Sequence, residues 1–148
     1  MKTERIILMI LILIFYVSCN KTSQLIEGFW AVDKIKYKGE DLSYLFMVNL
    51  IFFDENKCTL PIIQEYYGNI RKEEGEWKII KEGREIYIVI KTENEFFAGK
   101  HEVCFEKDYK NKVIKMIVKS KNLYFEATKG LFNFDKNNYL FDKYLCKD

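Results

Sequence analysis

The chain has 148 residues, of which 49% are apolar and 16% aromatic, with 24 basic and 22 acidic side chains. This composition supplies the core of one folded domain and excludes a disordered chain. The near-neutral charge, with its signs scattered along the sequence, provides neither the footprint of a nucleic-acid-binding protein nor a polybasic membrane patch.

Residues 1–18 have the pattern of an export signal. Lys2 and Arg5 precede twelve apolar residues at 6–17. That run is too short for a bilayer span of about 20 residues and is typical of a signal peptide. It ends at a serine followed by Cys19. This end resembles the lipobox of bacterial lipoproteins, with Tyr16 where leucine is usual, and the resemblance implies cleavage before Cys19 and lipidation of its sulfur.

Lipid on Cys19 would attach the protein to a membrane, because two or more acyl chains bind stably where one does not. Residues 19–26 are then a lipidated tether. They lack the acidic cluster that resembles a surface-export signal, so we expect an outer-membrane protein that faces the periplasm. The alternatives are an uncleaved apolar anchor and cleavage without lipidation. Once residues 1–18 are removed, the chain keeps 22 basic and 21 acidic residues.

Between residues 27 and 128, short segments of alternating apolar and polar residues follow one another at the spacing of an all-β domain. Their short links favour antiparallel neighbours. In the first segment Trp30 and Val32 lie on one face and Ile35 on the other, so we expect a β-bulge between them. The eight predicted strands are 29–37, 48–53, 58–65, 75–81, 85–92, 100–106, 112–119 and 123–128.

Two segments depart from the strand pattern. Asp41 begins a stretch that it could cap as one helical turn. In the tail, residues 129–148, the apolar residues from Tyr139 to Leu145 have helical spacing, and Asp135 is a start signal. We therefore expect a short C-terminal helix packed on the outside or the end of the sheet.

Eight antiparallel strands in sequence order predict an up-and-down β-barrel, whose closure removes the edge strands. Gly28-Phe29-Trp30 resembles the Gly-x-Trp signature of lipocalins, and residues 53–57 and 75–79 are similar to elements of small bacterial lipocalin-like lipoproteins. The resemblance covers about residues 25–128 and implies a lipocalin-like barrel, in some members with a pocket for a small apolar ligand. An arginine that closes the barrel base is missing, and Lys129 is the nearest basic residue.

Two functions are compatible with such a barrel, because eight strands leave an interior that side chains can fill or that can hold one small ligand. The leading hypothesis is a non-enzymatic lipoprotein that binds a small hydrophobic molecule. The alternative is a barrel without a ligand that docks an envelope protein, as an inhibitor, chaperone or assembly factor. An empty interior favours the first, and a filled barrel with an exposed aromatic patch favours the second. Five large side chains favour a filled or shallow core: Trp30, Phe53, Trp77, Phe105 and Phe125.

The sequence contains no convincing catalytic, cofactor or metal motif. His101 is the only histidine, and no Gly-x-Ser-x-Gly motif accompanies it. Cys104 is three residues away, but strand alternation directs the two side chains to opposite faces. No Cys-x-x-Cys pair suggests a metal site. We expect no enzyme activity and no cofactor, and nothing in the sequence sets the oligomeric state.

Apart from Cys19, three cysteines remain in a compartment that permits disulfides. The short tail has little core of its own, so we expect Cys146 to staple it to the barrel. Cys58, beside a charged turn, and Cys104, on a face shared with two glutamates, are both accessible partners. Three unpaired thiols are the remaining alternative.

Overall fold

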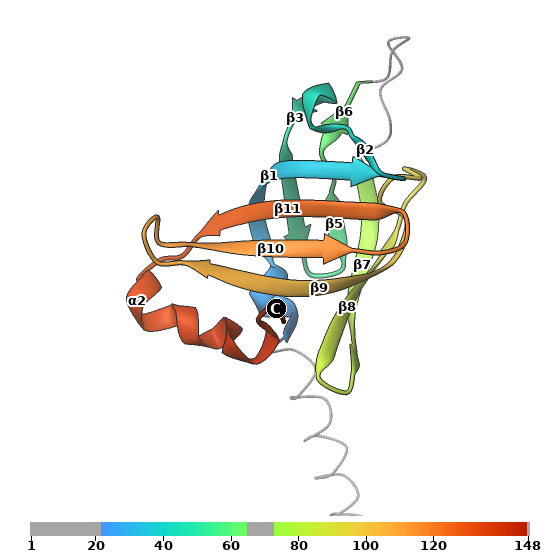
Figure 1. Cartoon of the computed structure of the whole chain (residues 1–148). Helices are drawn as coiled ribbons and strands as arrows, with labels where there is room; N and C mark the ends of the chain where they lie inside the picture. Colours follow the sequence, from blue (N-terminus) through green and yellow to red (C-terminus); the bar gives the residue numbers. More distant parts are fainter. Residues whose placement is uncertain (1–21, 65–72, 148) are drawn as a thin grey trace, which may run out of the picture.

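Eight antiparallel strands form a closed ring in the computed structural model, which describes residues 22–64 and 73–147. Each strand pairs with the next in the ring, and β11 pairs with β1 to close it (Figure 1). This confirms the up-and-down barrel expected from the sequence. The barrel strands are β1 (Gly28–Tyr37), β4 (Leu50–Asp54), β5 (Lys57–Thr59), β7 (Glu74–Glu82), β8 (Glu85–Lys91), β9 (Gly99–Asp108), β10 (Val113–Lys119) and β11 (Leu123–Gly130).

The first strand contains the expected β-bulge. The register of β1 against β11 shifts between Val32 and Lys34, so Asp33 is the extra residue. The bulge returns the strand to a common inner face. As a result Trp30, Val32 and Ile35 are all at most 1% exposed.

Two of the predicted strands are interrupted in the structure. Residues 46–54 divide into β3 (Phe46–Val48) and β4, and the described residues that follow β5 form β6 (Ile62–Ile63), which pairs with β3 in a separate two-stranded sheet. Pro61 has no N–H and cannot continue the ladder of β5. The small β3–β6 sheet therefore projects beyond the barrel (Figure 1).

The links at one end of the barrel, here called the mouth, join β1 to β4, β5 to β7, β8 to β9 and β10 to β11. The first of them contains β2 (Glu40–Asp41) and one helical turn, η1 (Ser43–Leu45). The N-cap of this turn is Leu42, one residue after the expected Asp41, and the Asp41 carboxylate accepts the N–H of Ser43 at 2.9 Å.

The opposite end of the barrel, here called the closed end, is covered by both ends of the described chain. Residues 22–26 are helical, and the tail forms α2 (Phe134–Asn137) and η2 (Asn138–Tyr144), which confirms a short C-terminal helix. The Thr22 and Tyr144 hydroxyls are 3.4 Å apart. No helix in the described residues is long and apolar enough to cross a membrane. The predicted signal, residues 1–18, and Cys19 lie outside the described residues.

Candidate functional site

Aromatic side chains fill the barrel interior from the closed end to the mouth. The five large side chains expected in the core are at most 3% exposed. Phe141 of η2 and Phe97 of the β8–β9 link add two more buried rings. The ring pairs in contact, with their centroid separations, are Trp30–Phe105 at 6.2 Å, Phe105–Phe141 at 4.9 Å, Phe53–Trp77 at 4.9 Å and Phe97–Phe125 at 6.0 Å.

Phe97 covers the interior at the mouth, a role that sequence reasoning missed. It is 0% exposed although it belongs to a link between strands. Its N–H donates to the Asn94 carbonyl at 3.1 Å, and its own carbonyl accepts a hydrogen bond from His101 Nε2 at 2.9 Å. These contacts fold the link inward. The only sequence signal is an aromatic pair, Phe96-Phe97, in a segment that otherwise reads as a turn.

His101 lies inside the barrel and is 3% exposed. Burial lowers the pKa of its imidazole, and the hydrogen bond to the Phe97 carbonyl opposes this shift. Since Nε2 donates to that carbonyl, Nδ1 is the acceptor nitrogen of the neutral ring, and it has no partner among the described residues. Cys104 lies in a disulfide, so these two residues do not form a nucleophile and base pair.

The buried imidazole makes stability depend on pH. Below pH 6.5 the unfolded chain binds a proton that the folded chain does not, so the free energy of unfolding should fall by up to about 1.4 kcal/mol per pH unit down to the folded pKa. Urea unfolding of the wild type and of His101→Gln at pH 7.5, 6.0 and 5.0 measures this. The difference in unfolding free energy between the two proteins should shift in favour of His101→Gln as the pH falls. A difference that does not depend on pH would contradict the assignment.

Lys129 lies at the closed end of the barrel, where the lipocalin resemblance led us to look for an arginine. Its Nζ lies 4.3 Å from the centroid of the Trp30 ring and donates to the carbonyls of Leu25 and Glu27 at 3.1 and 2.9 Å. Burial lowers the pKa of Lys129 to about 8, and the Glu27 carboxylate opposes this shift. The Trp30 indole N–H donates to the Ile26 carbonyl at 2.6 Å. These contacts tie residues 22–27 to the end of β11.

The structure joins Cys146 to Cys104 in a disulfide whose Cα atoms are 4.9 Å apart. Cys58 is a free, buried thiol, and burial raises its pKa to about 12. The Cys146 N–H also donates to the Phe105 carbonyl at 3.0 Å. The tail is therefore held against β9 by a covalent and a backbone bond.

Removing this disulfide should destabilise the protein. Cys104 and Cys146 are 42 residues apart, and opening a loop of this size with Cys146→Ser should cost about 2–4 kcal/mol of unfolding free energy. Denaturant titrations with and without a reductant check this. The reductant should lower the midpoint of the wild type and leave that of the variant unchanged; equal effects on both would contradict the prediction.

An outer face of the barrel carries apolar side chains, here called the apolar stripe: Phe29, Val48, Leu50 and Phe52. Phe29 of β1 and Phe52 of β4 are paired across the strands and stack with their centroids 4.3 Å apart. Phe29 is 63% exposed, Leu50 44% and Val48 41%. Alternation places Leu50 and Phe52 on one face of β4, and Val48 precedes them at the end of β3. A strand face in water normally carries polar residues, so this arrangement suggests contact with another molecule.

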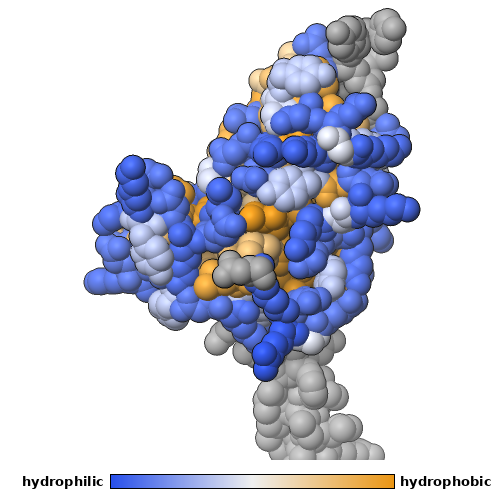
Figure 2. All heavy atoms as spheres, in the orientation of Figure 1, coloured by the Kyte–Doolittle hydropathy of each residue, from blue (hydrophilic) through white to orange (hydrophobic). Residues whose placement is uncertain are grey.

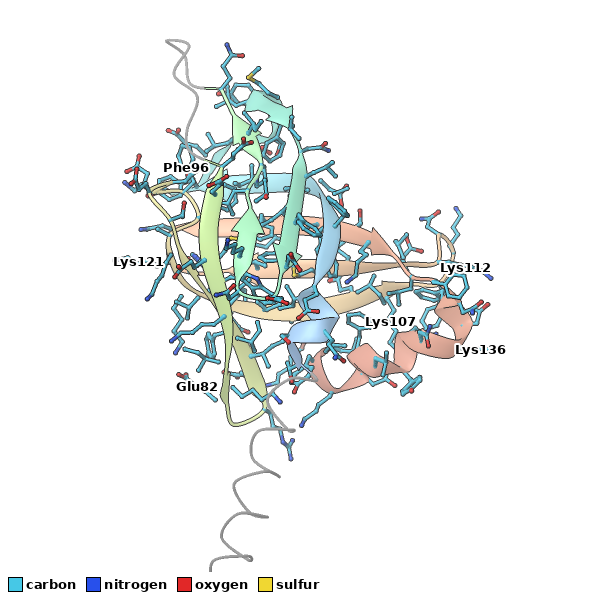
Figure 3. The ribbon with its side chains drawn as sticks, turned by 180° about the vertical axis from the view of Figure 1, so that it is seen from behind. Glu82, Phe96, Lys107, Lys112, Lys121 and Lys136 are labelled. Atoms are coloured by element: carbon cyan, nitrogen blue, oxygen red, sulfur yellow. A yellow bond between two sulfur atoms is a disulfide. The ribbon has the colours of Figure 1, made fainter. Side chains whose placement is uncertain are left out.

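A groove of about 710 Å³ adjoins the apolar stripe at Phe52 and crosses β5 and β7. Figure 3 views the molecule from this side. Gly75 lines the groove at a point with no room for a side chain, since a Cβ there would lie 2.9 Å from the Lys91 carbonyl oxygen. The charged side chains that line it are four carboxylates, Asp54, Glu74, Glu76 and Glu93, and two lysines, Lys57 and Lys91.

The face formed by β9, β10 and β11 has a different character. Hydrophilic side chains cover most of it, with an apolar area beside the tail (Figure 2). Lys115 lies between Glu106 and Glu126 at 3.8 and 3.5 Å, and Lys119 lies 3.3 Å from Glu102. These cross-strand pairs are typical of a sheet face in water.

The described residues contain no group of three or more histidine, cysteine, aspartate or glutamate side chains that could hold a metal ion. No family model, no curated protein and no solved structure matches the chain.

Proposed function

We propose that this chain is a lipoprotein of the outer membrane, anchored through lipid on Cys19 and facing the periplasm, whose lipocalin-like barrel docks an envelope protein. The observation that carries the proposal is the apolar stripe. The side chains of the stripe lie on the outer face of the barrel, where Phe29 is 63% exposed. Other side chains fill the interior. The acidic groove beside the stripe supplies the polar rim that protein interfaces have around an apolar centre.

The packed interior is the reason to prefer a protein partner over a small hydrophobic ligand. Pockets for such ligands are concave, apolar and largely preformed. Here Phe97 lies across the interior near the mouth, 6.0 Å from the ring of Phe125. A ligand in the barrel would have to displace these rings.

The docking proposal predicts that a charge in the apolar stripe releases the partner. Leu50→Glu should lower the amount of co-purifying protein at least tenfold, because it buries a carboxylate in the interface. Leu140→Glu is the matched control, since Leu140 is 47% exposed on η2 and Leu50 is 44% exposed on β4. The measurement is native mass spectrometry of the lipoprotein purified from its own envelope in mild detergent.

In the control a protein partner should remain bound at a fixed stoichiometry. Equal partner loss in both variants, or no partner in the wild type, would contradict docking at the stripe. A small apolar molecule retained by the wild type and by both variants would restore the ligand hypothesis.

A further inference from the structure

Strand β7 extends well beyond the neighbour on one of its sides. Its pairing with β5 covers Glu74 to Glu76, whereas its pairing with β8 covers Glu76 to Glu82. Figure 3 shows β7 continuing past the β4–β5 hairpin to the labelled Glu82. Six of its residues, 77–82, therefore have no strand beside them on the β5 side within the described residues.

The backbone groups that face this side can be assigned by alternation. The Trp77 N–H donates to the Asn56 carbonyl at 2.9 Å, so Trp77 faces the β5 side. In an antiparallel pair, residues alternate between those bonded to the partner and those that point away. Ile79 and Lys81 therefore point their N–H and C=O groups away from β8. These four groups, here called the open edge of β7, have no hydrogen-bond partner in the described part of the chain.

Two hollows meet at Asn56, whose carbonyl accepts the Trp77 N–H where the unpaired stretch of β7 begins. One, of about 200 Å³, is lined by Trp77, Lys78 and Glu76, among others. The Trp77 indole N–H is buried and has no acceptor in the described residues. The second hollow, of about 430 Å³, carries the carboxylates of Glu27 and Glu55; its lining is Ser23, Gln24, Glu27, Glu55 and Asn56.

We propose that the open edge of β7 binds an extended segment of a partner protein by β-strand addition, and that this segment alternates apolar and basic side chains. Unpaired N–H and C=O groups in a row are a template for a further strand, and neighbouring pockets for alternate side chains give such binding its specificity. Basic side chains fit the second hollow, with its two carboxylates, and apolar ones fit against the partly buried Ile79. The inference rests on the proposed docking function and names the backbone contact that the partner makes.

A partner segment fits this edge better than a second copy of the chain. Two β7 strands paired antiparallel would be related by a twofold axis, which turns the closed end of one copy away from that of the other. Two residues separate Cys19 from Thr22, a span of about 10 Å. Lipid on Cys19 in both copies could then not enter the same bilayer.

The test measures binding of a fluorescein-labelled peptide of alternating lysine and valine to the purified lipoprotein in detergent. Lys81→Pro removes an edge N–H, and proline is tolerated where a strand N–H faces solvent. Lys81→Thr is the matched control, because it removes the same charge and keeps the N–H. We expect at least tenfold weaker binding for Lys81→Pro, near wild-type binding for Lys81→Thr, and weaker binding of a glutamate–valine peptide to the wild type.

Amide exchange measured by NMR on the wild type keeps the proposal testable if Lys81→Pro does not fold. The amides of Ile79 and Lys81 should exchange fast in the free protein and become protected with the lysine–valine peptide, while that of Ile80 is protected throughout. Equal binding by both Lys81 variants, or no new protection at Ile79 and Lys81, would overturn the inference. Self-association of the wild type that Lys81→Pro abolishes would also overturn it, in favour of a second copy.

The same variants separate this inference from the docking function. If Lys81→Pro keeps the native partner and Leu50→Glu loses it, docking at the stripe stands and strand addition fails. If neither variant loses a partner, docking at the stripe fails. A lysine–valine peptide that still depends on the Lys81 N–H would then support the open edge as a separate site.

Discussion

If this chain is the proposed lipoprotein, Cys19→Ala should abolish lipidation and leave the precursor with its signal attached, because the variant lacks the sulfur that would accept the lipid before cleavage. The grounds are the twelve apolar residues at 6–17 and the serine that precedes Cys19. Incorporation of an alkyne-labelled fatty acid, followed by mass measurement of the protein, checks both effects. We expect complete loss of label and a mass that includes residues 1–18.

Cys58→Ala is the matched control for this experiment, since it makes the same change at a free thiol and should be labelled like the wild type. Normal labelling of Cys19→Ala would contradict lipidation at this residue. An unlabelled wild type that has lost residues 1–18 would indicate cleavage without lipidation. An unlabelled wild type that keeps them would indicate an uncleaved anchor.

Trp30→Ala should cost about 3–5 kcal/mol of unfolding free energy, a large share of the roughly 5–15 kcal/mol that stabilises a domain. Trp30 is 0% exposed, and its ring contacts Phe105 and lies under the Lys129 ammonium. The truncation leaves a cavity at the closed end and removes the aromatic face from a buried cation. Urea unfolding followed by circular dichroism measures the loss.

Phe29→Ala is the control for Trp30→Ala, because Phe29 is the next residue in β1 and is 63% exposed. It should shift the free energy of unfolding by no more than about 0.5 kcal/mol. A loss of similar size in both variants would show that the inner and outer faces of β1 have been assigned wrongly. Unchanged stability in Trp30→Ala together with loss of a bound molecule would make Trp30 a ligand contact.

Alternation along the sequence was enough to predict the barrel, because its strands have one buried and one solvated face. It also predicted a bulge between Val32 and Ile35, since Trp30 and Ile35 could share a face only if one residue were extra, and the structure places that residue at Asp33. The breaks between β3 and β4 and between β5 and β6 were missed because apolar residues continue on both sides of Asn49 and Pro61. Periodicity describes which side of a strand is buried, and it does not describe how long the neighbouring strand is.

The candidate site was harder to predict because it depends on contacts between distant residues. Lys129 binds a carbonyl 104 residues away, and no local pattern marks that contact. The sequence left Cys58 and Cys104 as equal partners for Cys146, because the choice depends on where the tail crosses the barrel. The open edge of β7 arises from a mismatch between strands that are each regular on their own.

The placement of β1 directly after the tether has a mechanical consequence. If the chain is held by lipid at Cys19, tension between the membrane and a docked partner reaches β1 through residues 22–27, which hydrogen bonds hold to Trp30, Lys129 and Tyr144. This strand is hydrogen-bonded to β11 on one side and, through its first four residues, to β4 on the other. A pull along the strand loads these bonds together in shear, whereas a pull across it would open them one at a time. The attachment point therefore lets the barrel bear load without unzipping.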